Sequence, residues 1–324
     1  MIGAKGVPST DTGLDATYSI LTMSLLEAIV LAVVQGLTEF LPISSTAHLR
    51  IVPALVGWSD PGAAFSAVIQ IGTLAAVLTY FWRDVVRIIG AMFADARRGK
   101  LATTHDAALG WMIAVGTLPI VVCGLVFKDA IETTLRSLYV VSAALVVLAV
   151  LLAAVELVVR RRIAAGDVGR EVEELTWRDA IVVGLAQAAA LIPGTSRSGS
   201  TIFGGLCCGL SREGAARYSF LLSIPSIAAA GLYQLVHARA ELLASQSQVV
   251  NLVAALVVSA VVGYATIPWL LGFLRTHSTF VFIAYRLVLA GVLLGLLTSG
   301  RLAPEDGASQ SAESPAAAGA VLSR

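Results

Sequence analysis

Long apolar runs, separated by short polar segments, dominate the chain. Six of these runs are about 20 residues long or longer, and they lie at 62–82, 108–127, 136–159, 213–236, 248–274 and 281–299. At about 1.5 Å of rise per residue, a helix of this length crosses a hydrocarbon core of about 30 Å. The sequence does not show the alternating segments of about ten residues that a membrane barrel would need. The pattern predicts an all-α bundle that crosses the membrane several times.

Two further apolar stretches are interrupted by polar residues. The first covers 24–57 with a break at 41–48, and the second covers 177–210 with a break at 192–201. Each half contains about 12–18 residues, which is too short to cross the bilayer alone. At each break a proline ends the incoming helix, and a Ser or Thr is placed to cap the outgoing one. The pattern predicts two re-entrant helical hairpins whose turns lie at membrane depth.

The two interrupted stretches, with the runs that follow them, form an internal repeat. Glu39 corresponds to Gln187, 148 residues later, and Phe65 corresponds to Tyr218, 153 residues later. The first copy extends over about 24–160 and the second over about 177–299. Matching polar breaks followed by a matching apolar run are harder to obtain by chance than general similarity between apolar helices. The sequence therefore predicts two related halves.

Arginine-rich loops predict the orientation of these halves. The loops at 83–107 and 160–178 each contain five Lys or Arg residues, whereas 128–136 contains two. Basic loops face the cytoplasm. Counting the crossings between them places the first hairpin on the outer side and the second on the cytoplasmic side. The halves are therefore predicted to be inverted-topology repeats, an arrangement that forms binding sites near the midplane.

The ends of the chain differ in composition from this membrane domain, which we place at 21–302. Residues 1–20 and 303–324 are rich in small and polar residues, and we expect both tails to be disordered. Hydrophobic residues make up 57% of the chain and charged residues 13%, about half the share in a soluble domain. The net charge of +1 gives no electrostatic support for a nucleic-acid partner.

Three charged or ionisable residues lie at the two breaks. Glu39 and His48 lie at the first break, Glu39 two residues before it, and Arg197 lies in the second. A charged side chain at the bilayer centre costs about 2.5–3.5 kcal/mol on insertion scales, so such residues usually serve a function. We expect the repeat to bring them together in one polar site. The alternative is structural: Glu39 and Arg197 pair only to hold the hairpins together, and His48 supports the cap at Ser44.

The second break has the chemistry of a phosphate site. Gly194 allows the backbone to approach a ligand closely, and Arg197 can bind phosphate oxygens in a bidentate fork. The N-terminus of the outgoing helix offers N–H groups and the positive end of the helix dipole. Four hydroxyl groups lie at this helix start, on Ser196, Ser198, Ser200 and Thr201.

The first break supplies candidate acid, base and nucleophile groups. Gln35 and Glu39 are four residues apart and share a helix face. Glu39 can ligate a divalent cation or accept a proton, and Gln35 can coordinate weakly through its carbonyl oxygen. Ser45 and His48 are placed to reach the same pocket. Together with Arg197, these groups are sufficient to hydrolyse a phosphate ester or anhydride.

Both breaks resemble the signature motifs of a known family. The sequences QGLTEFLPISSTAH at 35–48 and PGTSRSGST at 193–201 are similar to the motifs of the bacterial undecaprenyl pyrophosphate phosphatases of the bacitracin-resistance type. The resemblance covers about 24–299. It implies hydrolysis of undecaprenyl diphosphate to undecaprenyl phosphate and inorganic phosphate in the bacterial plasma membrane, usually with Mg²⁺ or Ca²⁺. The family residues implicated in activity match Glu39, Ser45, His48, Ser196, Arg197 and Thr201.

The resemblance leaves several questions open. Gln35 lies within the family's range of residues but removes one carboxylate from a two-carboxylate metal site. Ser45, His48 and an activated water are all candidate nucleophiles. We expect membrane lipids and the polyprenyl diphosphate as partners, an active site that opens to the external side, and a homodimer as a candidate assembly.

Two other classes of protein compete with this interpretation. A transporter or flippase of polyprenyl phosphate lipids would also use inverted repeats, but it needs no nucleophile beside its anion site. The unrelated acid-phosphatase-like lipid phosphatases need a histidine shortly after Ser-Arg, and none occurs between Arg197 and His237.

Overall fold

The computed structural model describes residues 23–132 and 134–304. These residues form helices, together with one isolated parallel bridge between Arg170 and Leu210, which confirms the all-α prediction. The tail predicted at 1–20 lies outside the described residues, as does all of the 303–324 tail except its first two residues. In that short part, the Pro304 carbonyl accepts a hydrogen bond from the Leu138 N–H at 3.0 Å.

Six helical segments in the described part of the chain have the length and apolar composition that a membrane crossing requires. They match the six predicted runs within a few residues, so the chain is a multi-pass membrane protein. The segments are α4 (Gly62–Val68) with α5 (Gln70–Tyr80), α7 (His105–Val126), α9 (Leu138–Ala164), α12 (Arg212–His237), α14 (Gln246–Thr276) and α15 (Phe280–Thr298).

The prediction of a polar loop at 83–107 was wrong for most of that segment. Residues Trp82–Arg97 form helix α6, which packs beside α7. Its apolar residues recur at helical spacing, and Val85, Ile88 and Met92 contact the hydrophobic core. Arg83, Asp84 and Arg87 lower the mean hydropathy of this segment and mask the helix in a search for apolar runs. Short helices also occupy the other connections: α8 (Lys128–Glu132), η1 (Thr134–Arg136), η2 (Val172–Glu174) and α13 (Arg239–Leu242).

The two interrupted stretches fold as pairs of short helices. The first pair is α2 (Leu25–Thr38) and α3 (Ser45–Val56), and the second is α10 (Trp177–Ala188) and α11 (Arg197–Cys207), with the 3-10 turn η3 (Ala189–Leu191) after α10. The outgoing helices begin directly after Ser44 and Ser196, because these serines cap them. Each break is therefore shorter than predicted, since α3 and α11 begin inside the predicted breaks.

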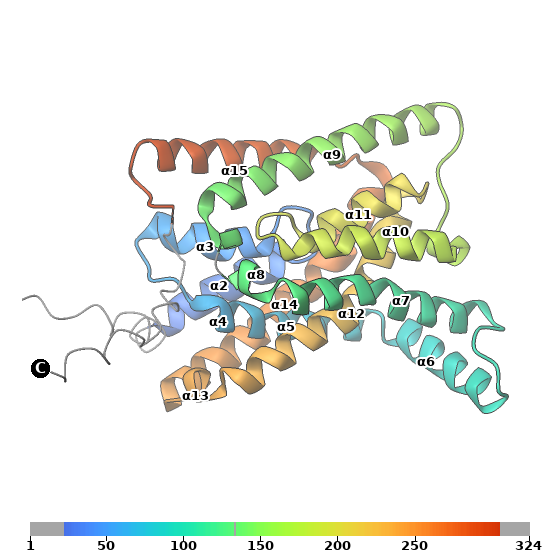
Figure 1. The fold of residues 1–324 in the computed structure, drawn as a ribbon, viewed down its shortest axis with the longest axis horizontal. Helices are drawn as coiled ribbons and strands as arrows, with labels where there is room; N and C mark the ends of the chain where they lie inside the picture. The colour runs from blue at the N-terminus through green and yellow to red at the C-terminus, as the bar shows by residue number, and fades with distance from the viewer. Residues whose placement is uncertain (1–22, 133, 305–324) are drawn as a thin grey trace, which may run out of the picture.

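The hairpins enter the bundle from opposite ends (Figure 1). The α2–α3 hairpin opens toward the end where α3 connects to α4, and the α10–α11 hairpin opens toward the end where α9 connects to α10. The connections α6–α7, with Arg98 and Lys100, and α9–α10, with Arg170, lie at that same second end. This arrangement agrees with the predicted topology, while the inverted relation of the two complete halves stays a prediction.

Each hairpin packs on a spanning helix of the other half. Helix α2 lies against α14, and α10 lies against α7. Glycines permit both close crossings: a Cβ on Gly36 would lie 2.7 Å from Val262 Cβ, and a Cβ on Gly184 would lie 2.6 Å from the Gly116 carbonyl oxygen. Because each hairpin packs on a helix of the other half, the turns of the two hairpins lie together inside the bundle.

Candidate active site

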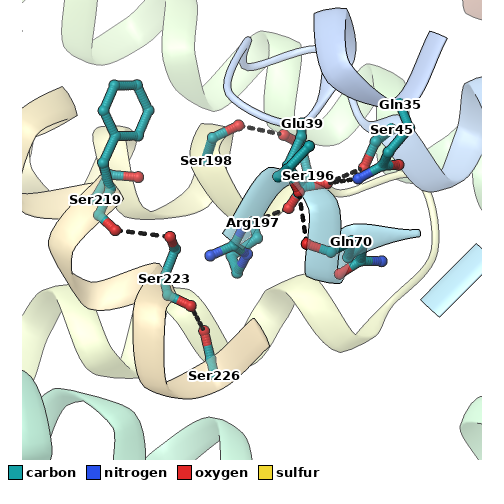
Figure 2. A network of polar contacts seen from close by, with 12 residues as sticks. Gln35, Glu39, Ser45, Gln70, Ser196, Arg197, Ser198, Ser219, Ser223 and Ser226 are labelled. Carbon is teal, nitrogen blue, oxygen red and sulfur yellow. Dashed lines mark hydrogen bonds and ion pairs between the residues drawn. The ribbon is translucent and has the colours of Figure 1, made fainter. Parts of the chain in front are cut away.

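Glu39 is the centre of the polar cluster between the two turns. It ends α2, and its side chain is only 4% exposed. One carboxylate oxygen forms an ion pair with Arg197, the first residue of α11. The other oxygen accepts hydrogen bonds from Gln35 Nε2 at 2.8 Å and from Ser45 Oγ at 2.7 Å (Figure 2). The structure thus confirms that Glu39 and Arg197 meet, although they are 158 residues apart.

Arg197 has donor capacity that the described residues do not use. Its Nη2 bonds Glu39, whereas its Nη1 is buried and has no hydrogen-bond partner among the described residues. A buried N–H without a partner is unfavourable by about 1–3 kcal/mol, and more for a charged group. An anion bound within reach of Nη1 would remove this penalty, as expected for a phosphate site.

A cavity of about 150 Å³ adjoins this cluster. Its polar wall contains Glu39, Ser45 and Arg197, together with residues from α5 and α12, while small and aliphatic side chains form the rest. The full lining is Glu39, Ser44, Ser45, Thr46, Gln70, Ile120, Ala190, Gly194, Ser196, Arg197, Ser226, Ile227 and Ala230. The cavity therefore offers a carboxylate, a hydroxyl and a guanidinium beside an apolar surface.

His48 is directed away from this cavity. Its Nδ1 lies 2.7 Å from the Ser44 carbonyl oxygen, and its Nε2 lies 2.7 Å from the hydroxyl of Tyr285 on α15. Because a carbonyl can only accept, Nδ1 donates and Nε2 accepts the tyrosine proton. His48 does not line the cavity, so the structure does not bring it to the same pocket as Glu39 and Arg197. Its predicted part in the chemistry stays a prediction.

The hydroxyl groups at the second break mostly hold the turn itself. Ser196 lines the cavity and accepts the Gly199 N–H at 3.1 Å. Ser198 donates to the Leu41 carbonyl of the first turn at 2.8 Å. Thr201 Oγ1 lies 2.6 Å from Ser219 Oγ on α12. Of the predicted phosphate-binding hydroxyls, Ser196 reaches the cavity, while Ser198 and Thr201 join the turn to its neighbours.

Ser200 and Gly194 both lie on the side of the second turn that faces helix α9. Ser200 lines a separate apolar groove against α9. Gly194 borders the cavity and has a φ of +93°, and a Cβ there would lie 2.5 Å from the Val141 carbonyl oxygen. The approach that requires glycine at 194 is therefore the packing of the turn against α9.

Three residues that the structure places at or beside the turns were not among the predicted site residues. Gln70 and Ser226 line the cavity, and Arg286 on α15 bonds carbonyl groups of both turns. Gln70 and Ser226 are polar positions within apolar runs, where single polar residues are common. Arg286 carried a stronger signal, because it is the only charged residue in the run 281–299.

Known proteins resemble this chain over the part that forms the two hairpins and the cavity. A family model described as "Bacitracin resistance protein BacA" matches residues 28–292. The undecaprenyl-diphosphatase of Chlorobium chlorochromatii (strain CaD3) is 57% identical over 282 residues, which are 87% of this chain and all of that protein. The undecaprenyl-diphosphatase of Prosthecochloris aestuarii (strain DSM 271 / SK 413) is 56% identical over 280 residues, 86% of this chain and 99% of that protein. Both breaks lie inside the matched range.

Proposed function

Since the chain belongs to the bacitracin resistance protein family BacA, we propose that it hydrolyses undecaprenyl diphosphate to undecaprenyl phosphate and inorganic phosphate. This reaction recycles the lipid carrier of cell-wall synthesis and underlies bacitracin resistance. One observation within the site carries the proposal: Ser45 donates to Glu39, and Arg197 pairs with the same carboxylate at the edge of a cavity. A nucleophile, a proton acceptor and a phosphate clamp thus occupy one place.

Binding of the substrate begins with its terminal phosphate. Arg197 offers its unpartnered Nη1, and the N-terminus of α11 adds the positive end of its dipole. The apolar side chains of Ile120, Ile227 and Ala230 line the same cavity and suit the start of a prenyl chain. The site therefore combines an anion clamp with an apolar exit.

Two steps complete the reaction in this proposal. The Ser45 hydroxyl oxygen attacks the terminal phosphorus while its proton passes to Glu39, which already accepts that hydroxyl. The bond from this phosphorus to the bridging oxygen breaks, and undecaprenyl phosphate leaves with the electron pair. Water then attacks the phosphoserine, gives one proton to the medium and releases inorganic phosphate, while Glu39 returns its proton to Ser45. Arg197 stabilises the charge on the transferred phosphoryl group.

The hydrogen bonds of His48 suggest a supporting role for its imidazole. The ring holds the carbonyl of Ser44, the residue directly before the proposed nucleophile. Direct attack by His48, or proton transfer through it, would require the ring to leave Ser44 and Tyr285. A water nucleophile activated by Glu39 is the remaining alternative, and it would not form a covalent intermediate.

The residues present could hold a divalent cation only if the substrate supplied some of the ligand oxygen atoms. Among the described residues no group of three or more His, Cys, Asp or Glu side chains could hold a metal ion. Glu39 could provide one oxygen, and Gln35 Oε1 is a buried acceptor without a partner in the described chain. Mg²⁺ usually binds through one or two carboxylates, water and phosphate oxygens. Such an ion would offset the negative charge of the diphosphate.

The basic residues near the helix ends orient the protein in the membrane. We propose the bacterial plasma membrane, with the α6–α7 and α9–α10 connections in the cytoplasm and the cavity open to the outer side. The arginine bias and the position of both connections at one end of the bundle support this orientation. A homodimer remains the candidate assembly, to be tested by the mass of the purified protein in detergent.

Lipid transport is the second candidate function, because the hairpins enter from opposite ends (Figure 1), as in transporters with inverted repeats. The hydrogen bond between Ser45 and Glu39 favours the phosphatase, since a carrier needs only the anion clamp. Transport would be measured as movement of labelled prenyl phosphate between leaflets of a vesicle.

The decisive experiment is phosphate release from C55 prenyl diphosphate by the purified protein. Wild-type protein should release one phosphate per lipid, and Glu39→Gln should release almost none. Glu213→Gln is a suitable control, because Glu213 pairs with Arg275 away from the cavity. Lipid binding without hydrolysis by the wild-type protein would contradict the phosphatase and leave the carrier.

A further inference from the structure

Arg286 is a charged side chain buried in the middle of an apolar helix. It is the only charged residue of α15 and has no exposed surface. Among the described residues, no carboxylate forms an ion pair with it, and its partners are backbone carbonyl oxygens. A charge buried in this way is costly in a membrane protein and marks a specific role.

The guanidinium joins three separate parts of the chain. Nη1 donates to the Pro42 carbonyl in the first turn at 3.2 Å, and Nη2 donates to the Gly194 carbonyl in the second turn at 3.0 Å. Nε and Nη2 also donate to the carbonyls of Leu145 and Ala144 on α9, both at 3.1 Å. The planar fork therefore fixes both turns against α9 and against each other.

The residues held in this way adjoin the candidate catalytic groups. Pro42 lies three residues before Ser45, and Gly194 lies three residues before Arg197. Gly194 also packs against Val141, one turn of α9 before Leu145. A change in the separation of the two turns would move the Ser45 hydroxyl relative to the Arg197 guanidinium, the two groups that must contact the same phosphate.

We propose that Arg286 is a positioning residue for the diphosphatase. Arg286 sets the separation of the two turns, and this separation determines the alignment of Ser45 with Arg197. The inference rests on the proposed function. Arg286 does not line the cavity, so it acts through the backbone of the turns. A misplacement of about 1 Å in a catalytic group can lower the rate about 100-fold.

The test is the kinetics of Arg286→Lys and Arg286→Gln on C55 prenyl diphosphate. Lysine keeps the charge but lacks the fork, so it cannot bridge both turns and α9. We expect kcat to fall about 10- to 100-fold in Arg286→Lys, with KM within about threefold of wild type, since the clamp and the prenyl contacts remain. The kcat of Arg286→Gln should fall at least as far as that of Arg286→Lys.

A distance measurement tests positioning without using activity. Spin labels at Leu37 and Ile192, both exposed on the surface of their hairpins, report the separation of the two hairpins once Cys123, Cys207 and Cys208 are replaced. The wild type should give one narrow distance distribution, and Arg286→Lys a broader or shifted one. If the wild type does not hydrolyse the lipid, the proposed function fails, whereas this distance comparison still reports on Arg286.

Arg212→Lys is the matched control. Arg212 is also largely buried, but it pairs with Glu156 on α9 and contacts neither turn. The Arg212→Lys substitution should lower the melting temperature in detergent and leave kcat per folded molecule unchanged. Wild-type kcat and distances in Arg286→Lys would overturn the proposal. Loss of folded protein in both Arg286 variants would also overturn it, because it would assign Arg286 to folding alone.

Discussion

Ser44 and Ser196 share one unusual backbone conformation at equivalent places in the two turns. Their φ angles are 74° and 73°, and among the described residues they are the only non-glycine residues with positive φ. Each caps the helix that follows, Ser44 by accepting the Ala47 N–H and Ser196 by accepting the Gly199 N–H. In the described part of the chain, the non-glycine residues with positive φ thus lie directly before Ser45 and Arg197, and such backbone strain is common at functional sites.

Substitution of these serines should separate strain from capping. Alanine at 44 or 196 loses the cap, worth about 1 kcal/mol, and keeps the strain of the left-handed region. Glycine also loses the cap but removes the strain, so Ser44→Gly and Ser196→Gly should be destabilised by only a few tenths of a kcal/mol. Thermal unfolding in detergent would rank the variants. Equal losses for glycine and alanine would mean that the cap alone matters.

Glu39→Gln should nearly abolish hydrolysis. The amide keeps the size of the side chain but cannot take the Ser45 proton, and it loses the ion pair with Arg197. General-base catalysis contributes about 10²- to 10⁴-fold, so we expect a loss of kcat in that range. The assay is phosphate release at saturating lipid. If Glu39→Gln kept normal turnover, Glu39 would only hold the two hairpins together.

Arg197→Lys should be badly impaired although the charge is kept. One ammonium cannot bond Glu39 and a phosphate oxygen with the fixed geometry of the guanidinium fork. We expect kcat/KM to fall at least tenfold, about 1.4 kcal/mol of transition-state stabilisation. Steady-state kinetics over a range of lipid concentrations would show this. Near-normal kcat/KM would indicate a purely structural pair.

Ser45 and His48 should differ in their effect on the rate. If Ser45 attacks phosphorus, Ser45→Ala should lose turnover, and Ser45→Ala/Glu39→Gln should be little worse, since residues that act as a unit are not additive. His48→Ala should lose less, because His48 contacts Ser44 and Tyr285 outside the cavity. Rapid-quench analysis should detect phosphoserine. Accumulation of phosphohistidine, or normal turnover by Ser45→Ala, would contradict this assignment.

Removal of divalent cations should slow the reaction. The site offers one carboxylate and one amide oxygen, so any ion is held largely by the substrate and exchanges readily. EDTA should lower phosphate release, and added Mg²⁺ or Ca²⁺ should restore it. Gln35→Glu adds a second carboxylate and should lower the Mg²⁺ concentration needed for half-maximal activity. Full activity in EDTA would exclude a metal-dependent step.

The membrane bundle and its two hairpins could be predicted because they depend on local sequence. The length of an apolar run decides whether a helix can span the bilayer, and a capping serine decides where the outgoing helix begins. The incoming helices end at Thr38 and Ala188, before Pro42 and Pro193 are reached, so the predicted helix ends at the prolines were wrong. The same signals placed Glu39 and Arg197 at the two breaks, and the repeat indicated that they would meet. Helix α6 escaped prediction because its charged residues interrupt the apolar positions, among which Ile88 is buried.

The sequence alone therefore predicts the spans, the breaks and the residues from which a site could be built. Which of those side chains share the cavity depends on the tertiary structure. His48 and Ser45 are three residues apart, yet His48 turns to Tyr285 while Ser45 turns to Glu39. That choice depends on helices distant in the chain, as do the positions of Gln70, Ser226 and Arg286. Side-chain directions at a helix start follow the partners that packing supplies, and no local pattern encodes those partners.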